Sequence, residues 1–589
     1  MRCSLHTRLN RVTVALLVFS TFAASQVAGD RRRRQLRSAD AAFHGGYAAE
    51  QSGDLPAARQ QFEKVVRMAP GIAEGHSALG SVLVQLGLYE PAIHELVRAL
   101  ALKADDRSAQ INLAVAYEQS GNHEKSIGLF RSLDRNTATP LPTQVMIFYI
   151  RALAATQQTK LAITKTQEAV TAAPDNPILH DMLGSLGAQR RDWDSAVNQF
   201  EEATRIDPKF AEAHLHLGLA LIMQQRTSEA VQELTTAADL SPQNPVVQVE
   251  LGKALLANGE NAKAVSVLQE ALVLAPSSLD AKYQVALALQ ASGQEQQAIS
   301  LLQEVVAADP HNSPALTNLG VALVQTGNSK AAVPLYQRAL KETPDAPLVH
   351  QDLGVAYLQQ SDLDDAVNEF RAGVRLAPDA YELHYDLGLA LKLKDDVTAA
   401  TGELQTAARL NPSSPDPPYT LGILYMQMGH FDDSVGEFTM ALKLRPENGD
   451  AWATLGSVYK QQHRLAEASD ALQKAIRLMP NQPGPHITLA GVLAQQGRTA
   501  EATAERKLAA DLSRTAVNRQ HAIFAANTGR MFLTKGQITD AVERYQEAVS
   551  SDPTNLEAHR GLATALQLAG RTAEAEAEKL TVAQLQAQP

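Results

Sequence analysis

Apolar residues recur along this chain at the three- and four-residue spacing that is typical of amphipathic helices. Leu217 and Leu221 show this spacing in one segment, and Val231, Leu234 and Ala238 show it in the next. Because an α-helix turns once in about 3.6 residues, this spacing gathers the apolar side chains on one face. Stretches with the strict alternation of a strand are hard to find. The pattern therefore predicts a chain made of short amphipathic helices.

Proline and glycine give these helices a fixed period. Ten prolines lie 34 residues apart, at Pro174, Pro208, Pro242, Pro276, Pro310, Pro344, Pro378, Pro412, Pro446 and Pro480. Leucine-glycine pairs keep the same register, with glycines at Gly184, Gly218, Gly252, Gly320, Gly354, Gly388, Gly422 and Gly456. A small residue follows each of these glycines after twelve positions, and a large apolar residue follows four positions later. One structural unit is therefore repeated along the chain.

Each repeated residue type has a mechanical reason. Glycine in a first helix and alanine in a second remove bulk where two antiparallel helices cross, so the helix axes can approach closely. Glycines such as Gly259 and Gly429 stand near the end of a first helix, where a left-handed residue can end it. Proline after the second helix stops that helix and fixes the turn into the next unit. Each repeat is therefore predicted to be a helical hairpin.

The pattern resembles the tetratricopeptide repeat. The residues that match it most closely are Trp452, Leu455, Gly456, Tyr459, Ala468, Ala475 and Pro480. The resemblance covers nearly the whole chain after the N-terminal segment and gives about sixteen units, from one near Ala39 to one near Leu556. It implies an all-α fold, a right-handed α-solenoid superhelix of about sixteen helical hairpins. One hairpin cannot bury its apolar face alone, whereas stacked neighbours can.

The register and its two breaks divide the chain. We expect a signal peptide or short membrane anchor over 1–29, a basic linker over 30–38, N-terminal units over 39–142, a central array over 143–516, an insertion at 517–521 and C-terminal units with a capping helix over 522–589. At the first break Ile150 replaces the repeated glycine, and the stack is expected to bend or loosen. At the second, Arg506 and Lys507 lie near a usual core position, and a longer helix or a loop is expected around Leu512–His521.

Charge and cysteine content exclude several classes of protein. The formal net charge is −11, and the basic residues are scattered among more numerous acids, so a nucleic-acid partner is not expected. The single cysteine, Cys3, can form neither an internal disulfide nor a thiolate metal cluster. Folding is therefore expected to rest on helix packing.

The N-terminal segment has the pattern of an export signal. Arg2, Arg8 and Arg11 precede an apolar run over 12–24, and small residues follow it. The run is shorter than the roughly 17–25 residues of a spanning helix, which favours export to the periplasm or cell exterior over a membrane anchor at 12–24. Arg31–Arg34 argue the other way, because positive charge beyond the run resists translocation. Membrane contact is expected only through this segment.

The sequence carries none of the common catalytic motifs. It has no Gly-rich phosphate loop, no His-Glu-x-x-His, no CxxC and no Gly-x-Ser-x-Gly. Histidines do recur at the fourth position of the units, at His76, His180, His214, His350, His384, His486 and His559. Successive units hold them about a helix-pair thickness apart, too far to share a metal, so they are interpreted as seam residues in the place of Trp452. We therefore expect no enzyme activity, no cofactor and no metal.

By resemblance, the first helices line a concave groove that holds partner proteins or peptides. The resemblance assigns the second, fifth, sixth, ninth, twelfth and thirteenth positions of each unit to this groove. Here these positions include Leu215, Leu219, Tyr283, Leu287, Val321, Val324, Val355, Leu358, Tyr385, Leu389, Tyr419, Ile423 and Met426. Such a surface suits an extended or helical hydrophobic segment. In the alternative interpretation, the ninth-position aliphatics merely pack between neighbouring first helices.

Two functions from different classes are open at this point. The first is a non-catalytic scaffold that binds protein segments in the groove, in the cell envelope or outside the cell. The second is a regulatory or substrate-recruiting subunit of an enzyme whose catalytic part is a separate chain. No sequence feature favours the second.

Overall fold

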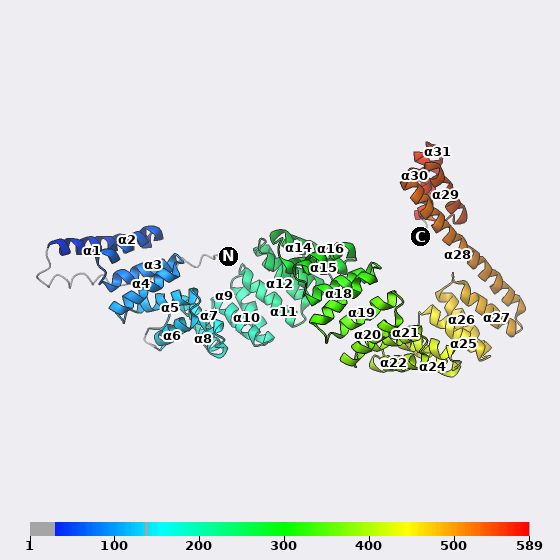
Figure 1. The fold of residues 1–589 in the computed structure, drawn as a ribbon, viewed down its shortest axis with the longest axis horizontal. Coiled ribbons are helices and arrows are strands. Elements are labelled where there is room, and N and C mark those ends of the chain that lie inside the picture. Colours follow the sequence, from blue (N-terminus) through cyan, green and yellow to red (C-terminus); the bar gives the residue numbers. More distant parts are fainter. Residues whose placement is uncertain (1–29, 136–138, 588–589) are drawn as a thin grey trace. The chain divides into compact units, whose positions relative to one another are not determined.

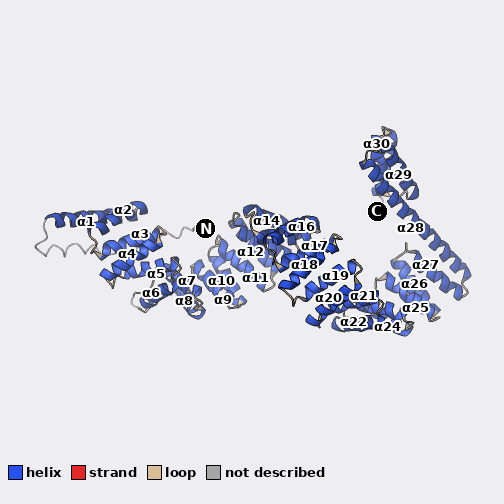
Figure 2. Ribbon diagram, viewed as in Figure 1, coloured by secondary structure: helices blue, strands red, loops and turns tan. Residues whose placement is uncertain are grey.

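The computed structural model describes residues 30–135 and 139–587, so the expected export segment over 1–29 lies outside it. Within the described ranges every regular element is an α-helix (Figure 2). None of these helices combines the length and the hydrophobicity needed to cross a membrane. The chain divides between Ala308 and Asp309 into two compact units, inside the stretch expected to be one central array (Figure 1).

The first compact unit holds eight hairpins. Its helices are α1 (Asp30–Gln51), α2 (Leu55–Met68), α3 (Ala73–Gln85), α4 (Tyr89–Leu102), α5 (Arg107–Gln119), α6 (His123–Asp134), α7 (Thr143–Ala155), α8 (Thr159–Ala172), α9 (Pro177–Gln189), α10 (Trp193–Ile206), α11 (Ala211–Met223), α12 (Thr227–Leu240), α13 (Pro245–Ala257), α14 (Asn261–Leu274), α15 (Leu279–Ala291) and α16 (Glu295–Ala308). Odd-numbered helices are the first helices of their hairpins.

The second compact unit also holds eight hairpins, because its longest helix contributes to two of them. Its helices are α17 (Ser313–Gln325), α18 (Ser329–Glu342), α19 (Pro347–Gln359), α20 (Leu363–Leu376), α21 (Tyr381–Leu393), α22 (Val397–Leu410), α23 (Asp416–Gln427), α24 (Phe431–Leu444), α25 (Gly449–Gln461), α26 (Leu465–Leu478), α27 (Pro483–Gln495), α28 (Thr499–Thr534), α29 (Ile538–Ser551), α30 (Leu556–Leu568) and α31 (Thr572–Gln586).

The turn inside each hairpin contains one residue with a left-handed backbone. Ten of these residues are glycines, such as Gly259 at φ 77° and Gly429 at φ 76°, and six are not, such as Gln225 at φ 62°. The left-handed conformation predicted for the glycines is therefore confirmed. Together these turns give sixteen hairpins in the described part of the chain, as the period predicts.

The repeated glycine of each first helix lies against the large apolar residue of the second. A Cβ atom at Gly388 on α21 would stand 2.7 Å from Leu404 Cγ and 3.4 Å from the Ala400 carbonyl oxygen on α22. At Gly354 it would stand 2.7 Å from the ring of Phe370. The predicted close approach is confirmed, and the side chain that occupies the freed space is the large apolar one.

The first break in register is bridged by buried apolar residues. One core cluster runs from Ala114 to Leu186 across this break. Ile150, in the place of glycine, is fully buried, and so is Thr166, which stands where other hairpins carry a large apolar residue. The large and the small side chain have exchanged helices, which keeps the volume between them filled.

Two other segments are helical. The range 30–38, expected to be a linker, instead forms part of α1, because it contains neither glycine nor proline. Around Leu512–His521 the structure has the longer helix rather than a loop, so the insertion at 517–521 lies within α28. The last helix, α31, fully buries only Ala575, as a capping helix does.

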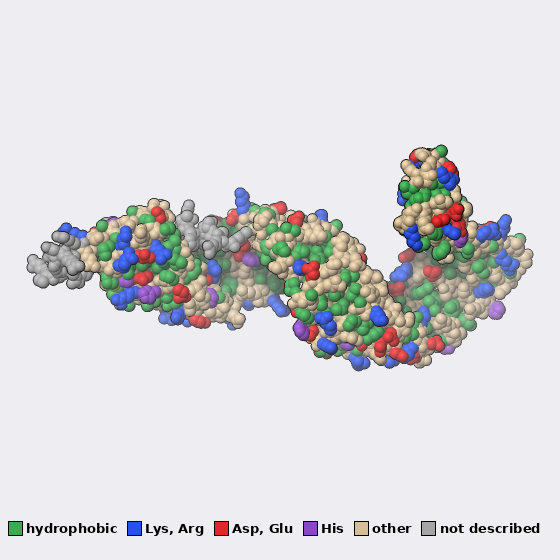
Figure 3. All heavy atoms as spheres, turned by 45° about the horizontal axis from the view of Figure 1, so that its top comes forward, with side chains coloured by type: hydrophobic (Ala, Val, Ile, Leu, Met, Phe, Trp, Pro, Cys, Tyr) green, Lys and Arg blue, Asp and Glu red, His purple; other side chains and the backbone are tan. Residues whose placement is uncertain are grey.

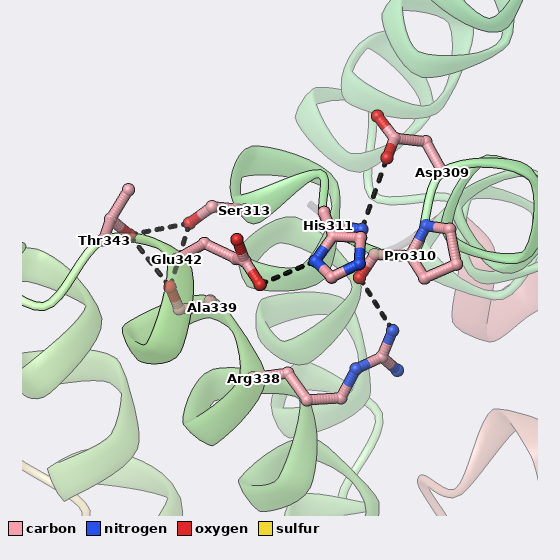
Figure 4. A network of polar contacts seen from close by, with 8 residues as sticks. All are labelled: Asp309, Pro310, His311, Ser313, Arg338, Ala339, Glu342 and Thr343. Atoms are coloured by element: carbon pink, nitrogen blue, oxygen red, sulfur yellow. Dashed lines mark hydrogen bonds and ion pairs between the residues drawn. The ribbon is translucent and has the colours of Figure 1, made fainter.

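Polar contacts fasten the start of α17 to the end of α18 (Figure 4). The ring Nδ1 of His311 lies 2.7 Å from a carboxylate oxygen of Glu342, and this contact raises the pKa of His311. Arg338 donates a hydrogen bond of 2.9 Å to the carbonyl oxygen of Pro310. The loop after the period-setting proline is therefore held by its own hairpin.

Candidate protein-binding face

The first helices form a shared face within each compact unit. In the first unit α11 contacts α9 and α13, and in the second α19 contacts α17 and α21. Because the first helices approach one another along the stack, they line its inner side. All thirteen expected groove residues lie on first helices, four in the first unit and nine in the second. The two sets belong to separate compact units and form two separate faces.

All thirteen side chains are half-buried. Val355, Leu358 and Tyr385 pack against the core cluster of α20 to α23. Tyr419 and Ile423 pack against that of α24 and α25. These side chains pack within the stack and also leave part of their surface exposed. The structure is therefore compatible both with packing between first helices and with contact to a partner. Partner contact remains a prediction.

Two tyrosines, Tyr385 on α21 and Tyr419 on α23, stand at the fifth position of their repeat units. Burial raises the pKa of both Tyr385 and Tyr419, and a hydrogen bond with Thr420 partly offsets this for Tyr385. The Tyr419 ring packs edge-on against Phe438, with centroids 5.9 Å apart. Both phenols are therefore neutral near pH 7 and offer aromatic surface with a polar tip.

Two carboxylates lie on the same first helices as these tyrosines and their aliphatic neighbours. Asp386 on α21 accepts a hydrogen bond of 2.6 Å from Gln351 on α19, and burial raises its pKa. Burial raises the pKa of Asp352 on α19 to about 6. Both residues occupy a sixth position, which the resemblance assigns to the groove. Half-buried carboxylates here favour a partner that brings a hydrogen-bond donor to the apolar surface.

The face of the first unit carries a histidine-carboxylate contact. His216 on α11 lies 2.7 Å from Asp181 on α9. Burial alone would lower the pKa of His216, but the hydrogen bond and charge of Asp181 outweigh it and the pKa is raised. His214, two residues away, instead contacts Glu233 on α12. The two histidines therefore point to different faces, as predicted.

The fourth-position histidines hold hairpins together. In the hairpin of α3 and α4, Nδ1 of His76 lies 2.6 Å from Glu95, and Nε2 lies 3.1 Å from the Pro70 carbonyl oxygen of the preceding unit. Glutamate takes the same place opposite five other histidines, and Gln199 takes it opposite His180. In the described ranges no three His, Cys, Asp or Glu side chains gather as a metal site would require.

A cavity of about 430 Å³ lies between α24, α25 and α26, away from the expected groove residues. Trp452 lines it, and the Lys474 ammonium stands 4.1 Å from the centre of the Trp452 ring. Lys443, Glu467 and Asp470 also line it. Within each unit, basic and acidic side chains are interspersed over the face seen in Figure 3. No pattern in the sequence predicts the cavity beside Trp452.

Repeat-family models match the chain along most of its length. Models described as tetratricopeptide repeats match residues 5–71, 77–140, 182–245 and 221–289, and a TPR-repeat model matches 529–570. The model of the Cilia and flagella-associated protein 70 C-terminal domain matches 287–522. The chain is a tetratricopeptide-repeat protein.

Several solved structures resemble this tetratricopeptide-repeat protein, while no curated protein sequence matches it. The APC/C hetero-tetramer Cut9-Hcn1 shares 15% identity over 90% of this chain and 96% of that one, with a TM-score of 0.33. MamA from Desulfovibrio magneticus RS-1 shares 22% identity over 29% and 96%, with a TM-score of 0.28. YrrB, a TPR protein with an unusual peptide-binding site, shares 21% identity over 30% and 92%, with a TM-score of 0.27. At these scores the likenesses add no argument about this chain.

The histidine-glutamate contacts of this tetratricopeptide-repeat protein were missed at the sequence level. The sequence pattern that could have revealed these contacts is the constant separation of 19 residues between each fourth-position histidine and its partner. Trp452 occupies the same fourth position of its unit, and its indole nitrogen donates a hydrogen bond of 2.8 Å to the Pro446 carbonyl oxygen. Histidine and tryptophan at this position therefore reach the same acceptor.

Proposed function

We propose that this protein is a non-catalytic scaffold that binds hydrophobic segments of other proteins along the first-helix face of α19, α21 and α23. What supports this is the combination on one face of half-buried aliphatic side chains, Tyr385 and Tyr419, and the carboxylates of Asp352 and Asp386. Apolar surface of this kind gives affinity, and the few polar groups orient the bound segment.

We also propose that the scaffold works after export. The support is the sequence pattern of residues 1–29, with basic residues before an apolar run and small residues after it. N-terminal sequencing of the protein isolated from its source tests this. A mature N-terminus near residue 29 is the expected result, and an intact Met1 on a cytoplasmic protein would contradict it.

The binding face is tested with charge. We expect Tyr385→Glu together with Tyr419→Glu to abolish partner capture by the full chain, because two carboxylates would have to be desolvated under the partner. Met440→Glu is the matched control, since Met440 is half-exposed on the second helix α24 of the same compact unit. Circular dichroism establishes that both variants remain helical. Capture that survives in the double variant would place the site elsewhere.

A photo-crosslinking residue at Leu389 gives an independent measurement. Leu389 lies on α21, four residues after Tyr385, and is half-buried, so a segment on this face comes within reach of it. Crosslinks at Leu389 that disappear in the double tyrosine variant are expected. Crosslinks at position 440 with none at 389 would favour the opposite face.

A further inference from the structure

Helix α28 joins two hairpins without a turn. It is the second helix of one hairpin with α27 and the first helix of the next with α29. The stretch 514–521 between these two parts is exposed at every residue. The hairpin of α28 and α29 therefore begins on a helix that has no preceding hairpin packed beside it.

Comparison with the other repeat units shows which side chains of α28 lack a neighbouring hairpin. The third and tenth positions of the repeat unit, both on its first helix or at its start, are buried in every other hairpin that follows another hairpin. Ala213 and Ala220 on α11, for example, are 0% and 2% exposed. In α28 the same two positions hold Phe524 and Met531, which are 72% and 46% exposed. The face that normally packs on the preceding hairpin is open here and carries larger apolar side chains.

The first hairpin of the chain provides an internal comparison. No hairpin precedes α1 in the described residues either, and the third and tenth positions of its unit, Ala41 and Ala48, are exposed. Both residues are small, so little apolar surface meets water. In α28, Val517 extends the stripe of Phe524 and Met531 at the same seven-residue spacing and is 65% exposed. An apolar stripe of about four helical turns is typical of a surface that another helix covers.

The preceding hairpin of this chain does not complement the stripe. Its end carries Arg506 at the position where other hairpins bury a large apolar residue, such as Phe438 or Leu472. The last described hairpin carries Lys579 at that position and exposes it as well, next to Leu580, which is 62% exposed. At both hairpins the position that would face Phe524 is therefore a cation and not an apolar side chain.

The charges beside the stripe indicate which kind of partner helix it would bind. No Asp or Glu stands between Asp511 and Asp540, whereas this stretch holds Arg514, Arg519, Arg530 and Lys535 in a chain of net charge −11. Three of these cations are exposed and lie within ion-pair distance of a carboxylate, Arg514 of Asp511, Arg519 of Asp552 and Arg530 of Glu557. Arg514 lies three residues before Val517 and Lys535 four residues after Met531, so a cation flanks each end of the stripe. Two copies paired through this helix would bring like charges together. We propose that Val517, Phe524 and Met531 form a docking stripe for an acidic amphipathic helix of a partner protein, separate from the first-helix face.

The probe for this surface is a pair of synthetic helical peptides with one leucine stripe, flanked by glutamates in one peptide and by lysines in the other. We expect the full chain to bind the acidic peptide at least tenfold more tightly than the lysine peptide in fluorescence anisotropy. Phe524→Ala with Met531→Ala should abolish this binding and leave the fold intact, because these side chains are 72% and 46% exposed. Arg514→Glu with Lys535→Glu should remove the preference for the acidic peptide.

Three results would overturn the proposal. The first is equal binding of the two peptides, and the second is acidic-peptide binding that persists in Phe524→Ala/Met531→Ala. The third is a different occupant: a dimer in analytical ultracentrifugation, or sedimentation with phosphatidylserine vesicles, that the same double variant abolishes. The Tyr385→Glu/Tyr419→Glu variant should bind the acidic peptide as the wild type does, so failure of the proposed function and failure of this proposal are distinguishable.

Discussion

The imidazole of His384 on α21 lies 2.6 Å from the carboxylate of Glu403 on α22. Its second nitrogen lies 3.0 Å from the carbonyl oxygen of Pro378, at the end of the preceding hairpin. One buried ring therefore connects the two helices of its own hairpin and the loop that leads into them. The same arrangement, repeated along the chain, fixes the angle between helices where a purely apolar seam would not.

We predict that His384→Ala lowers the free energy of unfolding by about 2 kcal/mol, because it removes a buried ring together with its contacts to Glu403 and the Pro378 carbonyl oxygen. Glu403→Gln should cost less than about 1 kcal/mol, since Gln199 already serves opposite His180 at 2.9 Å. Hydrogen exchange across α21 and α22 in the full chain measures both. Equal loss in the two variants would show that the contact depends on the carboxylate charge.

Gly388→Ala should destabilise its hairpin, although alanine is the better helix former. The new Cβ would stand 2.7 Å from Leu404 Cγ, so the helices must separate or Leu404 must change rotamer, at about 1–3 kcal/mol. Gly402→Ala on the partner helix α22 is the control, because a Cβ there meets nothing within 4 Å. The control should gain about 0.5–1 kcal/mol from helix propensity. Thermal unfolding that moves both variants in the same direction would contradict the packing argument.

The carboxyl of Asp352 gives the first-helix face a pH dependence. Its pKa is raised by burial from 3.8 to about 6, so the folded state holds the proton more tightly than the unfolded state. Stability from this group therefore falls as the pH rises from about 4 to about 6 and stays reduced above that. Asp352→Asn should raise the free energy of unfolding by roughly 1–2 kcal/mol at pH 7.5, allowing for partial exposure.

The same variant should be indistinguishable from the wild type near pH 4, where both residues are neutral. Urea unfolding at the two pH values measures the difference. Asp386→Asn serves for comparison, because the pKa of Asp386 is also raised by burial while Gln351 donates a hydrogen bond to it. A stability gain for Asp352→Asn that is equal at both pH values would mean that packing, and not protonation, is responsible.

The polar end of the α27 and α28 hairpin predicts where the array can be cut. A chain that ends after Arg514 keeps Arg506 on its last surface, so it should remain soluble, monodisperse and helical. A chain that ends after Pro480 loses α27 and exposes Leu472, which is fully buried in the intact chain. We expect this shorter chain to aggregate, as seen by size-exclusion chromatography. Equal behaviour of the two truncations would show that Arg506 does not end the array.

The period alone was sufficient to predict the hairpins, their number and their turns. These features depend on residues that are close in sequence: glycine at a left-handed turn such as Gly259, or proline after a second helix such as Pro276. The candidate binding face was harder to predict from the sequence. The groove positions could be read from the register, but their half-burial depends on how closely successive first helices approach.

By itself, then, the sequence determined an all-helical array of sixteen hairpins, because local spacing specifies each hairpin and each hairpin needs neighbours. The tertiary structure alone decided that α28 continues from one hairpin into the next, since a sequence around Leu512–His521 without glycine or proline permits both a helix and a loop. It also decided that Phe524 is exposed while the equivalent Ala213 is buried. Burial of a repeated position depends on whether a neighbouring hairpin is stacked on it, and the register of one hairpin does not contain that information.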